Sequence, residues 1–140
     1  MATTTASVSI SSDILSSPLN ISSETTLMKA GTTADGLDGF DVGYIDIATG
    51  TNFDLLDANN SGLNNSKANK VYICNESTDE TFYVVITIDS TVIGRLYAGD
   101  WMFIPWGSLD QHDDIEIQAN TGTNTIGYAF FHEGRTLGSA

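Results

Sequence analysis

The sequence predicts an all-β protein, an antiparallel β-sandwich of jelly-roll type with an extended N-terminal arm. Three observations support this fold class. Thirteen of the 140 residues are glycine and many others are Ser or Thr, and these residue types disfavour helices. Short apolar runs follow one another along the chain, separated by clusters of Gly, Asn and Asp. No window of helical length keeps the apolar period of about 3.6 residues that an amphipathic helix shows.

The chain divides into an arm, residues 1–26, and one β-sandwich domain, residues 27–140. The arm is rich in Ser and Thr, and its aliphatic residues, among them Val8, Ile10 and Ile21, are too sparse to form a core. We expect the arm to add a strand to its own sheet or to the sheet of a neighbouring molecule. The alternative is a frayed terminus.

Eight strands are expected in the domain, near residues 26–30, 42–48, 70–75, 81–89, 92–98, 101–105, 114–119 and 125–133. The alternation is cleanest in 114–119, where Ile115 and Ile117 point one way and Glu116 and Gln118 the other. Residues 54–58 are expected to make only a single turn. The predicted core consists of Phe82, Val84, Ile86, Leu96, Phe103, Ile115, Ile117 and Phe130.

Gly99 and Asp100 separate two apolar runs, and Gly at the first position suits a two-residue hairpin turn of type II′. In that register one face carries Leu96, Ala98, Trp101 and Phe103, and the other carries Arg95, Tyr97, Met102 and Ile104. The second set is too apolar for a free surface. We therefore expect an attachment or oligomer surface formed by Tyr97, Met102 and Ile104, with Trp106 at its end. The alternative is that a second sheet of the same sandwich covers these residues.

Charge and composition exclude several classes of partner. The net charge is −13 and only five residues are Lys or Arg, so we expect no nucleic-acid binding and no contact with an anionic membrane. No apolar run approaches the roughly 18 residues of a membrane-spanning helix. The single cysteine, Cys74, rules out an intrachain disulfide. The first residues lack the features of a signal peptide, so we expect the chain to fold in a cytoplasm.

No constellation in the sequence predicts catalysis, a cofactor or a transition metal. There is no G-x-S-x-G motif, and Cys74 lies in a predicted strand without a nearby histidine. Gly99, Pro105 and Gly107 match the start of the second cupin motif, G-x5-P-x-G. The histidine that should follow after two residues comes after four, at His112, and the first cupin motif is missing. His112 and His132 alone do not make the three or four converging ligands that such a metal requires.

The acidity of the chain makes calcium a further candidate ligand. Residues 57–62 reproduce the first six positions of an EF-hand loop, but its twelfth position is Ala68 in place of a bidentate glutamate. Asp35, Asp38 and Asp41 are spaced by three residues. We expect both segments to be polar turns, with a weak calcium site as the alternative.

The second half of the chain carries a set of short motifs in a fixed order. These are a V-Y-I-x-N strand (71–75), a following strand (82–88), a Leu before an A-G-D turn (96–100), an apolar-Pro-Trp segment (103–106), a D-I-x-I strand (114–117) and a final aromatic strand ending at Glu (128–133). Together they resemble small virion structural proteins of tailed bacteriophages, with the strongest likeness to those of marine cyanobacterial phages. The likeness spans roughly residues 69–134.

The resemblance implies a non-enzymatic β-sandwich that decorates or cements a phage capsid. Its partners would be the major capsid protein or other virion proteins, and we expect a homo-oligomer, with a trimer as one candidate. The protein would fold in the host cytoplasm and then reside in the virion. The alternatives are a tail or head-fibre component, or a carbohydrate-binding module that stacks sugars on Trp106 and Tyr97.

Overall fold

The structure is a computed structural model that describes residues 4–14, 19–50, 52–57, 68–106 and 114–133. These residues form ten strands and, within the described ranges, no helix. The strands are β1 (Thr5–Ser12), β2 (Leu19–Thr26), β3 (Gly39–Ala48), β4 (Asn52–Leu56), β5 (Lys70–Asn75), β6 (Tyr83–Ile88), β7 (Thr91–Tyr97), β8 (Trp101–Pro105), β9 (Ile115–Ala119) and β10 (Thr123–His132).

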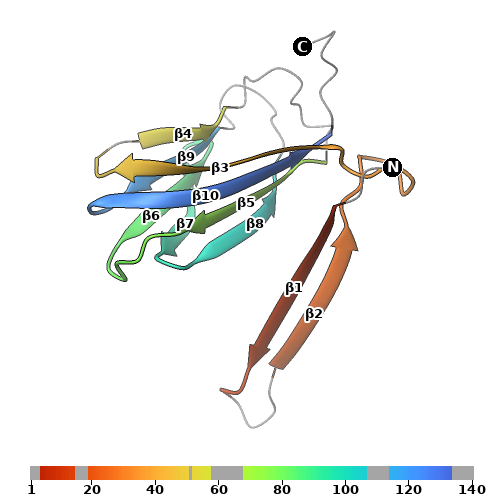
Figure 1. Cartoon of the computed structure of the whole chain (residues 1–140), viewed down its shortest axis with the longest axis horizontal. Coiled ribbons are helices and arrows are strands. Elements are labelled where there is room, and N and C mark those ends of the chain that lie inside the picture. Colours follow the sequence, from red (N-terminus) through yellow and green to blue (C-terminus); the bar gives the residue numbers. More distant parts are fainter. Residues whose placement is uncertain (1–3, 15–18, 51, 58–67, 107–113, 134–140) are drawn as a thin grey trace.

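Two four-stranded antiparallel sheets pack face to face as a jelly-roll-like sandwich, which confirms the predicted fold class (Figure 1). One sheet has the strand order β3-β10-β5-β8 and the other β4-β9-β6-β7. The buried core between them comprises Ile47, Val71, Ile73, Val84, Ile86, Leu96, Trp106, Ile115, Ile117, Ala119, Ile126 and Phe130. Each fully buried aliphatic side chain of this kind contributes about 1.5–3 kcal/mol to the free energy of folding.

The strand predictions succeed where one face of a strand is buried. In β9, Ile115, Ile117 and Ala119 are buried while Gln118 is exposed, as its alternation predicts. The prediction of a turn at 54–58 is wrong, because Asn52–Leu56 pairs with β9 as the edge strand β4. A bulge between Asp54 and Leu56 breaks the alternation, and this irregularity hides the strand in the sequence.

The segment near 26–30 is not a strand of the sandwich. Leu27 and Leu37 are both buried, and the Leu37 amide donates to the Leu27 carbonyl across 2.9 Å. The Glu133 carboxylate accepts hydrogen bonds from the amides of Ala30 (3.1 Å) and Ala68 (2.8 Å). These contacts fasten the loop that follows the arm to the end of β10.

The predicted hairpin across Gly99 and Asp100 is wrong, because β7 and β8 belong to different sheets. Gly99 has the positive φ of 89° that the turn requires, and the Asp100 amide donates to the Tyr97 carbonyl across 2.8 Å. The turn is then held by Asn75, whose carbonyl accepts from the Gly99 amide (2.8 Å) and whose amide donates to the Asp100 carbonyl (2.9 Å). The chain therefore crosses from one sheet to the other at this point.

This crossing reverses the faces expected for β8. Met102 and Ile104 pack against the core, in register with Ile73 and Val71. Trp101 is exposed, and Phe103 is only half-buried and lies outside the core cluster. Phe82 is likewise half-buried and outside the cluster, so these two members of the predicted core are wrong.

Residues 4–26 contain the two strands of a hairpin that makes its own sheet, β1-β2. From here on, the arm means the described strands β1 and β2 of the segment that the sequence assigned to residues 1–26. It projects away from the sandwich, and its strands diverge from the β3-β10-β5-β8 sheet toward the far end (Figure 1). At its base the Leu27 amide donates to the Thr4 carbonyl across 2.8 Å. The sequence predicted an extended segment, and the structure shows two strands paired with each other.

Candidate functional site

The surface of the β3-β10-β5-β8 sheet that points away from the core is apolar across all four strands. Strand register aligns its residues in three rows: Phe40, Phe131, Lys70 and Pro105; Val42, Ala129, Tyr72 and Phe103; Tyr44, Gly127, Cys74 and Trp101. Residues aligned in register share a face of a sheet. We call this set of twelve residues the outer face.

Much of the outer face is in contact with solvent. Phe40, Val42, Tyr44 and Trp101 are between 52% and 77% exposed. Among these twelve residues the one charged side chain is that of Lys70, whose Nζ donates to the Ala68 carbonyl across 3.1 Å. Two carboxylates border the outer face: Asp46 follows in the next row of β3, and Glu76 lies 3.2 Å from the position that a Cβ on Gly127 would take. Contiguous exposed apolar patches commonly mark interaction surfaces, and this makes the outer face the candidate site.

The aromatic residues of the outer face are held by their neighbours. The rings of Tyr72 and Trp101 lie 6.2 Å apart, centroid to centroid. Tyr44 covers Gly127, since a Cβ added to this glycine would lie 3.1 Å from the Tyr44 ring. Burial raises the pKa of the Tyr72 hydroxyl and of the Cys74 thiol. The cysteine therefore stays protonated near neutral pH, which fits a packing role and makes it a poor nucleophile.

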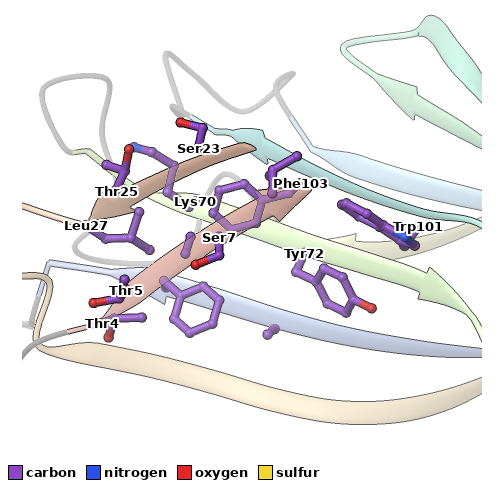
Figure 2. Close-up of a pocket in the computed structure, with 14 residues that line it drawn as sticks. Thr4, Thr5, Ser7, Ser23, Thr25, Leu27, Lys70, Tyr72, Trp101 and Phe103 are labelled. Atoms are coloured by element: carbon purple, nitrogen blue, oxygen red, sulfur yellow. The ribbon is translucent and has the colours of Figure 1, made fainter. Parts of the chain in front are cut away.

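An apolar groove of about 590 Å³ lies between the outer face and the arm (Figure 2). Its lining residues are Thr4, Thr5, Ala6, Ser7, Val8, Ser23, Thr25, Leu27, Lys70, Tyr72, Trp101, Phe103, Ala129 and Phe131. In Figure 2, Tyr72, Trp101 and Phe103 come from the sheet, and Thr5 and Ser7 from the strand that crosses it.

The residues predicted to form an interface do not lie together. Tyr97 is exposed at the end of β7, in the other sheet, where its ring lies 5.0 Å from that of Tyr83. Met102 and Ile104 pack against the core from the inner side of β8. Trp106 is 3% exposed and packs edge-on against Phe130, with ring centroids 5.4 Å apart. Trp106 is therefore a core residue, and the expectation that it anchors a partner is corrected.

The chemistry of the histidines can be checked at His132 only, since His112 lies outside the described residues. His132 is buried and packs against Phe130, with ring centroids 4.9 Å apart and ring planes tilted by 40°. Its Nε2 lies 3.4 Å from a carboxylate oxygen of Asp41, and its Nδ1 lies 3.1 Å from the Glu133 carbonyl. The ring is packed and hydrogen-bonded as part of the sandwich.

One group of acidic side chains converges in the part of the chain that the structure describes. Asp54, Asp114 and Glu116 place one carboxylate oxygen each within 4.8 Å of one another. Burial, then repulsion from Glu116, Asp114 and Asp57, raises the pKa of Asp54. This cluster was not predicted, because it depends on the pairing of β4 with β9.

Of the two segments that could bind calcium according to the sequence, the structure describes only one in full. Most of the EF-hand-like segment, residues 58–62, lies outside the described residues. In the other segment, Asp38 pairs with Lys29 at 3.0 Å and Asp41 lies beside His132.

The comparisons with known proteins name no family. No family model matches the chain, and a search of curated proteins finds no match. Among solved structures, the chain is similar to a cupin protein from Bacteroides fragilis, with 22% sequence identity over 74% of this chain and 78% of that chain, at a TM-score of 0.39. Within the described residues, no helix is long and apolar enough to cross a membrane.

Proposed function

We propose that this chain is a non-enzymatic structural protein of a bacteriophage virion, most simply a decoration or cement protein of the capsid. The observation that carries the proposal is the outer face, a sheet surface with four exposed large apolar residues and one charged side chain. The virion assignment is supported by the order of motifs in residues 69–134, which resembles small virion proteins of tailed phages.

A surface of this composition suits protein–protein association. Interface cores are enriched in Tyr, Trp and Phe and depleted in Asp and Glu. The outer face has this composition, although the chain as a whole carries a net charge of −13. Trp101 and Tyr44 are the residue types that most often anchor an interface when they become buried. The outer face therefore replaces the predicted surface around Tyr97, Met102, Ile104 and Trp106 as the place where the chain joins other proteins.

The same proposal fits a capsid, tail or head-fibre position, since each needs an apolar association surface and no catalytic centre. The chain would fold in the host cytoplasm and remain in the released particle. Its partners would be the major capsid protein or other virion proteins, including sister copies.

The first test is mass spectrometry of purified phage particles whose genome encodes this chain. We expect the protein in the particle at a copy number comparable to that of other structural proteins. Its absence from purified particles would overturn the virion assignment. Cryo-electron microscopy of the same particles would then distinguish the capsid from the tail or a head fibre.

The second test asks whether the outer face is the association surface. Trp101→Glu should weaken binding to particles assembled without the protein by about 30-fold or more, the loss expected for a buried aromatic anchor. Val92→Glu is the matched control, because Val92 is also an exposed apolar residue but lies on β7 of the other sheet. Equal loss in both variants, or no loss in Trp101→Glu, would rule out the outer face.

A carbohydrate-binding function remains the second candidate, on different residues from those first considered. Trp106 is buried and cannot stack on a sugar, but Tyr44 and Trp101 are exposed on one sheet surface. Aromatic rings displayed in this way can stack on pyranose rings. Retention on insoluble polysaccharides that is lost in Tyr44→Ala, without any presence in virions, would favour this function.

A further inference from the structure

We infer that the arm of one copy of this chain packs on the outer face of a second copy. This inference rests on the proposed function in one respect only: it names the partner of the association surface, a sister copy. The reasons are the alternation of the arm, the incomplete covering of the outer face and the distribution of charge.

The arm is a two-faced hairpin. On one face, Ala6, Val8 and Ile10 of β1 lie in register with Thr25, Ser23 and Ile21 of β2. The opposite face carries Thr5, Ser7, Ser9 and Ser11 in register with Thr26, Glu24, Ser22 and Asn20. We call the first set the apolar face of the arm. It contains no charged side chain, whereas the Glu24 carboxylate lies on the opposite face and accepts a hydrogen bond from Ser7 Oγ at 3.3 Å.

The apolar face of the arm is only partly covered by its own sandwich. Ala6 and Val8 are half-buried, Thr5 and Ser7 beside them are exposed, and all four border the groove. Farther along, Ile10 is 48% exposed and Ile21 is 44% exposed. The arm diverges from the sheet in this direction (Figure 1), so the described part of the sandwich does not cover Ile10 and Ile21.

The outer face is left open in a complementary way. The residues of the sheet that line the groove come from β5, β8 and β10, and none comes from β3. Phe40, Val42 and Tyr44 on β3 are consequently among the most exposed large apolar residues of the described chain. Each copy thus offers an unburied apolar hairpin and an unburied apolar sheet surface.

Charge favours a second copy at this contact. Two chains with a net charge of −13 repel each other at most orientations. The apolar face of the arm has no carboxylate, so none faces the carboxylates of Asp46 and Glu76 that border the outer face, where Lys70 is the one charged residue among the twelve. Arm-on-face packing therefore brings two copies together without opposing carboxylates.

The low stability expected of an isolated arm also favours a contact with a second copy. An isolated two-stranded hairpin is marginally stable in water, because it cannot bury enough surface to offset the entropy of ordering it. The root of the arm is fixed by the bond from the Leu27 amide to the Thr4 carbonyl and by the burial of Leu27. The outer face of a neighbouring copy would bury the apolar side chains of the projecting part of the arm, which include Ile10 and Ile21.

The test measures mass by light scattering after size-exclusion chromatography, over a range of protein concentrations. We expect the full chain to be an oligomer and the Ile10→Glu/Ile21→Glu variant to be a monomer. The control is Ser9→Glu/Ser22→Glu, which also places two glutamates at directly paired positions, one residue away on the opposite face. It carries the same added charge and the same cross-strand repulsion, and we expect it to remain an oligomer.

Mixing two monomeric variants separates arm-on-face packing from face-on-face packing. We expect Val42→Glu/Tyr44→Glu to be monomeric, with a melting temperature close to that of the full chain since both side chains are exposed. Mixed with Ile10→Glu/Ile21→Glu, it should form a two-chain species, because its intact arm meets the other variant's intact outer face. Oligomers that survive the arm substitutions, or a mixture that stays monomeric, would overturn the inference.

Different results would overturn the arm-on-face contact and the proposed virion function. A full chain that is monomeric at every concentration, yet binds particles in a manner sensitive to Trp101→Glu, would end this inference and leave the virion role intact. A chain that oligomerises through the arm but is absent from particles would do the reverse.

Discussion

Asn75 and Asn124 are joined by their buried side-chain amides, with Nδ2 of Asn75 donating to Oδ1 of Asn124 across 3.1 Å. The same Nδ2 donates to the Leu96 carbonyl across 2.9 Å, and Leu96 belongs to the opposite sheet. The Asn75 Oδ1 accepts from the Ser77 amide at 3.0 Å. With its backbone bonds to Gly99 and Asp100, Asn75 ties together the two sheets at the turn where the chain crosses between them.

The first prediction concerns this network. Asn75→Ala should lower the free energy of unfolding by about 1–3 kcal/mol, because it leaves the Leu96 carbonyl and the Asn124 amide without their buried partner. Urea denaturation followed by circular dichroism would measure the loss. The control is Asn120→Ala, because the Asn120 side chain is exposed. Equal stability of the two variants would show that the network contributes nothing.

The second prediction concerns the acidic cluster. Burial and the nearby carboxylates raise the pKa of Asp54, so its protonated form is favoured in the folded state relative to the unfolded state. Ionised Asp54 therefore lowers stability at neutral pH, and this cost disappears as the pH falls through its raised pKa. Asp54→Asn should increase stability at pH 7 by less than about 1 kcal/mol, because solvent screens a carboxylate this exposed.

Melting temperatures as a function of pH would test the sign. The gain from Asp54→Asn should vanish below about pH 3.9, the ordinary pKa of aspartate, where the carboxyl is protonated in both states. Glu80→Gln, at an exposed turn, is the control for the loss of one negative charge. A gain that persists at low pH would mean that the amide acts through something other than the removed charge.

The third prediction concerns metal. The sequence predicts no bound metal, and this stays a prediction. Calcium takes about six to eight oxygen ligands, and the described cluster offers one oxygen each from three carboxylates. We expect EDTA to leave the melting temperature unchanged and millimolar calcium to shift it no more in the parent chain than in Asp54→Asn. A rise of several degrees in the parent chain alone would locate a calcium site at Asp54.

Local pattern predicted β9 but misread the turn at Gly99 and Asp100. In β9 the alternation is decided by one buried face, so the residues themselves contain the information. A glycine-first turn between two apolar runs looks the same whether the chain makes a hairpin or crosses between sheets. The difference lies in the bonds from Asn75, more than twenty residues earlier in the chain, to the backbone of Gly99 and Asp100. Distant hydrogen bonds of this kind are not visible in a local pattern.

The residues predicted to form one exposed surface do not lie on one face, for a related reason. The strands β5, β8 and β10 are apolar on both faces, so parity alone cannot tell which face meets the other sheet. The register expected from the sequence placed Trp101 on the core face of β8 and Met102 and Ile104 on the exposed face, whereas the structure has the two faces the other way round. The two-faced pattern of the arm was present in residues 5–12, where Ala6, Val8 and Ile10 alternate with Thr and Ser. Counting that period would have predicted a strand there.

The last prediction sets the two tryptophans against each other. Trp106 is buried against Phe130 in the core, and Trp101 is exposed on the outer face. Trp106→Ala should therefore lower the free energy of unfolding by about 3–5 kcal/mol, the cost of removing a large core side chain. Trp101→Ala should lower it by about 0.5 kcal/mol or less if the chain is monomeric during the measurement. Chemical denaturation of both variants at low protein concentration would measure this difference.

Fluorescence provides an independent check, since these are the two tryptophans of the chain. Trp101→Phe leaves Trp106 as the reporter, and its emission should be blue-shifted and resist quenching by iodide because the indole is shielded from water. Trp106→Phe leaves Trp101, whose emission should be red-shifted and readily quenched in the monomer. In the oligomer, Trp101 should become protected if a neighbour's arm covers the outer face. Strong quenching of Trp106, or a larger stability loss in Trp101→Ala than in Trp106→Ala, would contradict the placement of β8 and with it the position of the outer face.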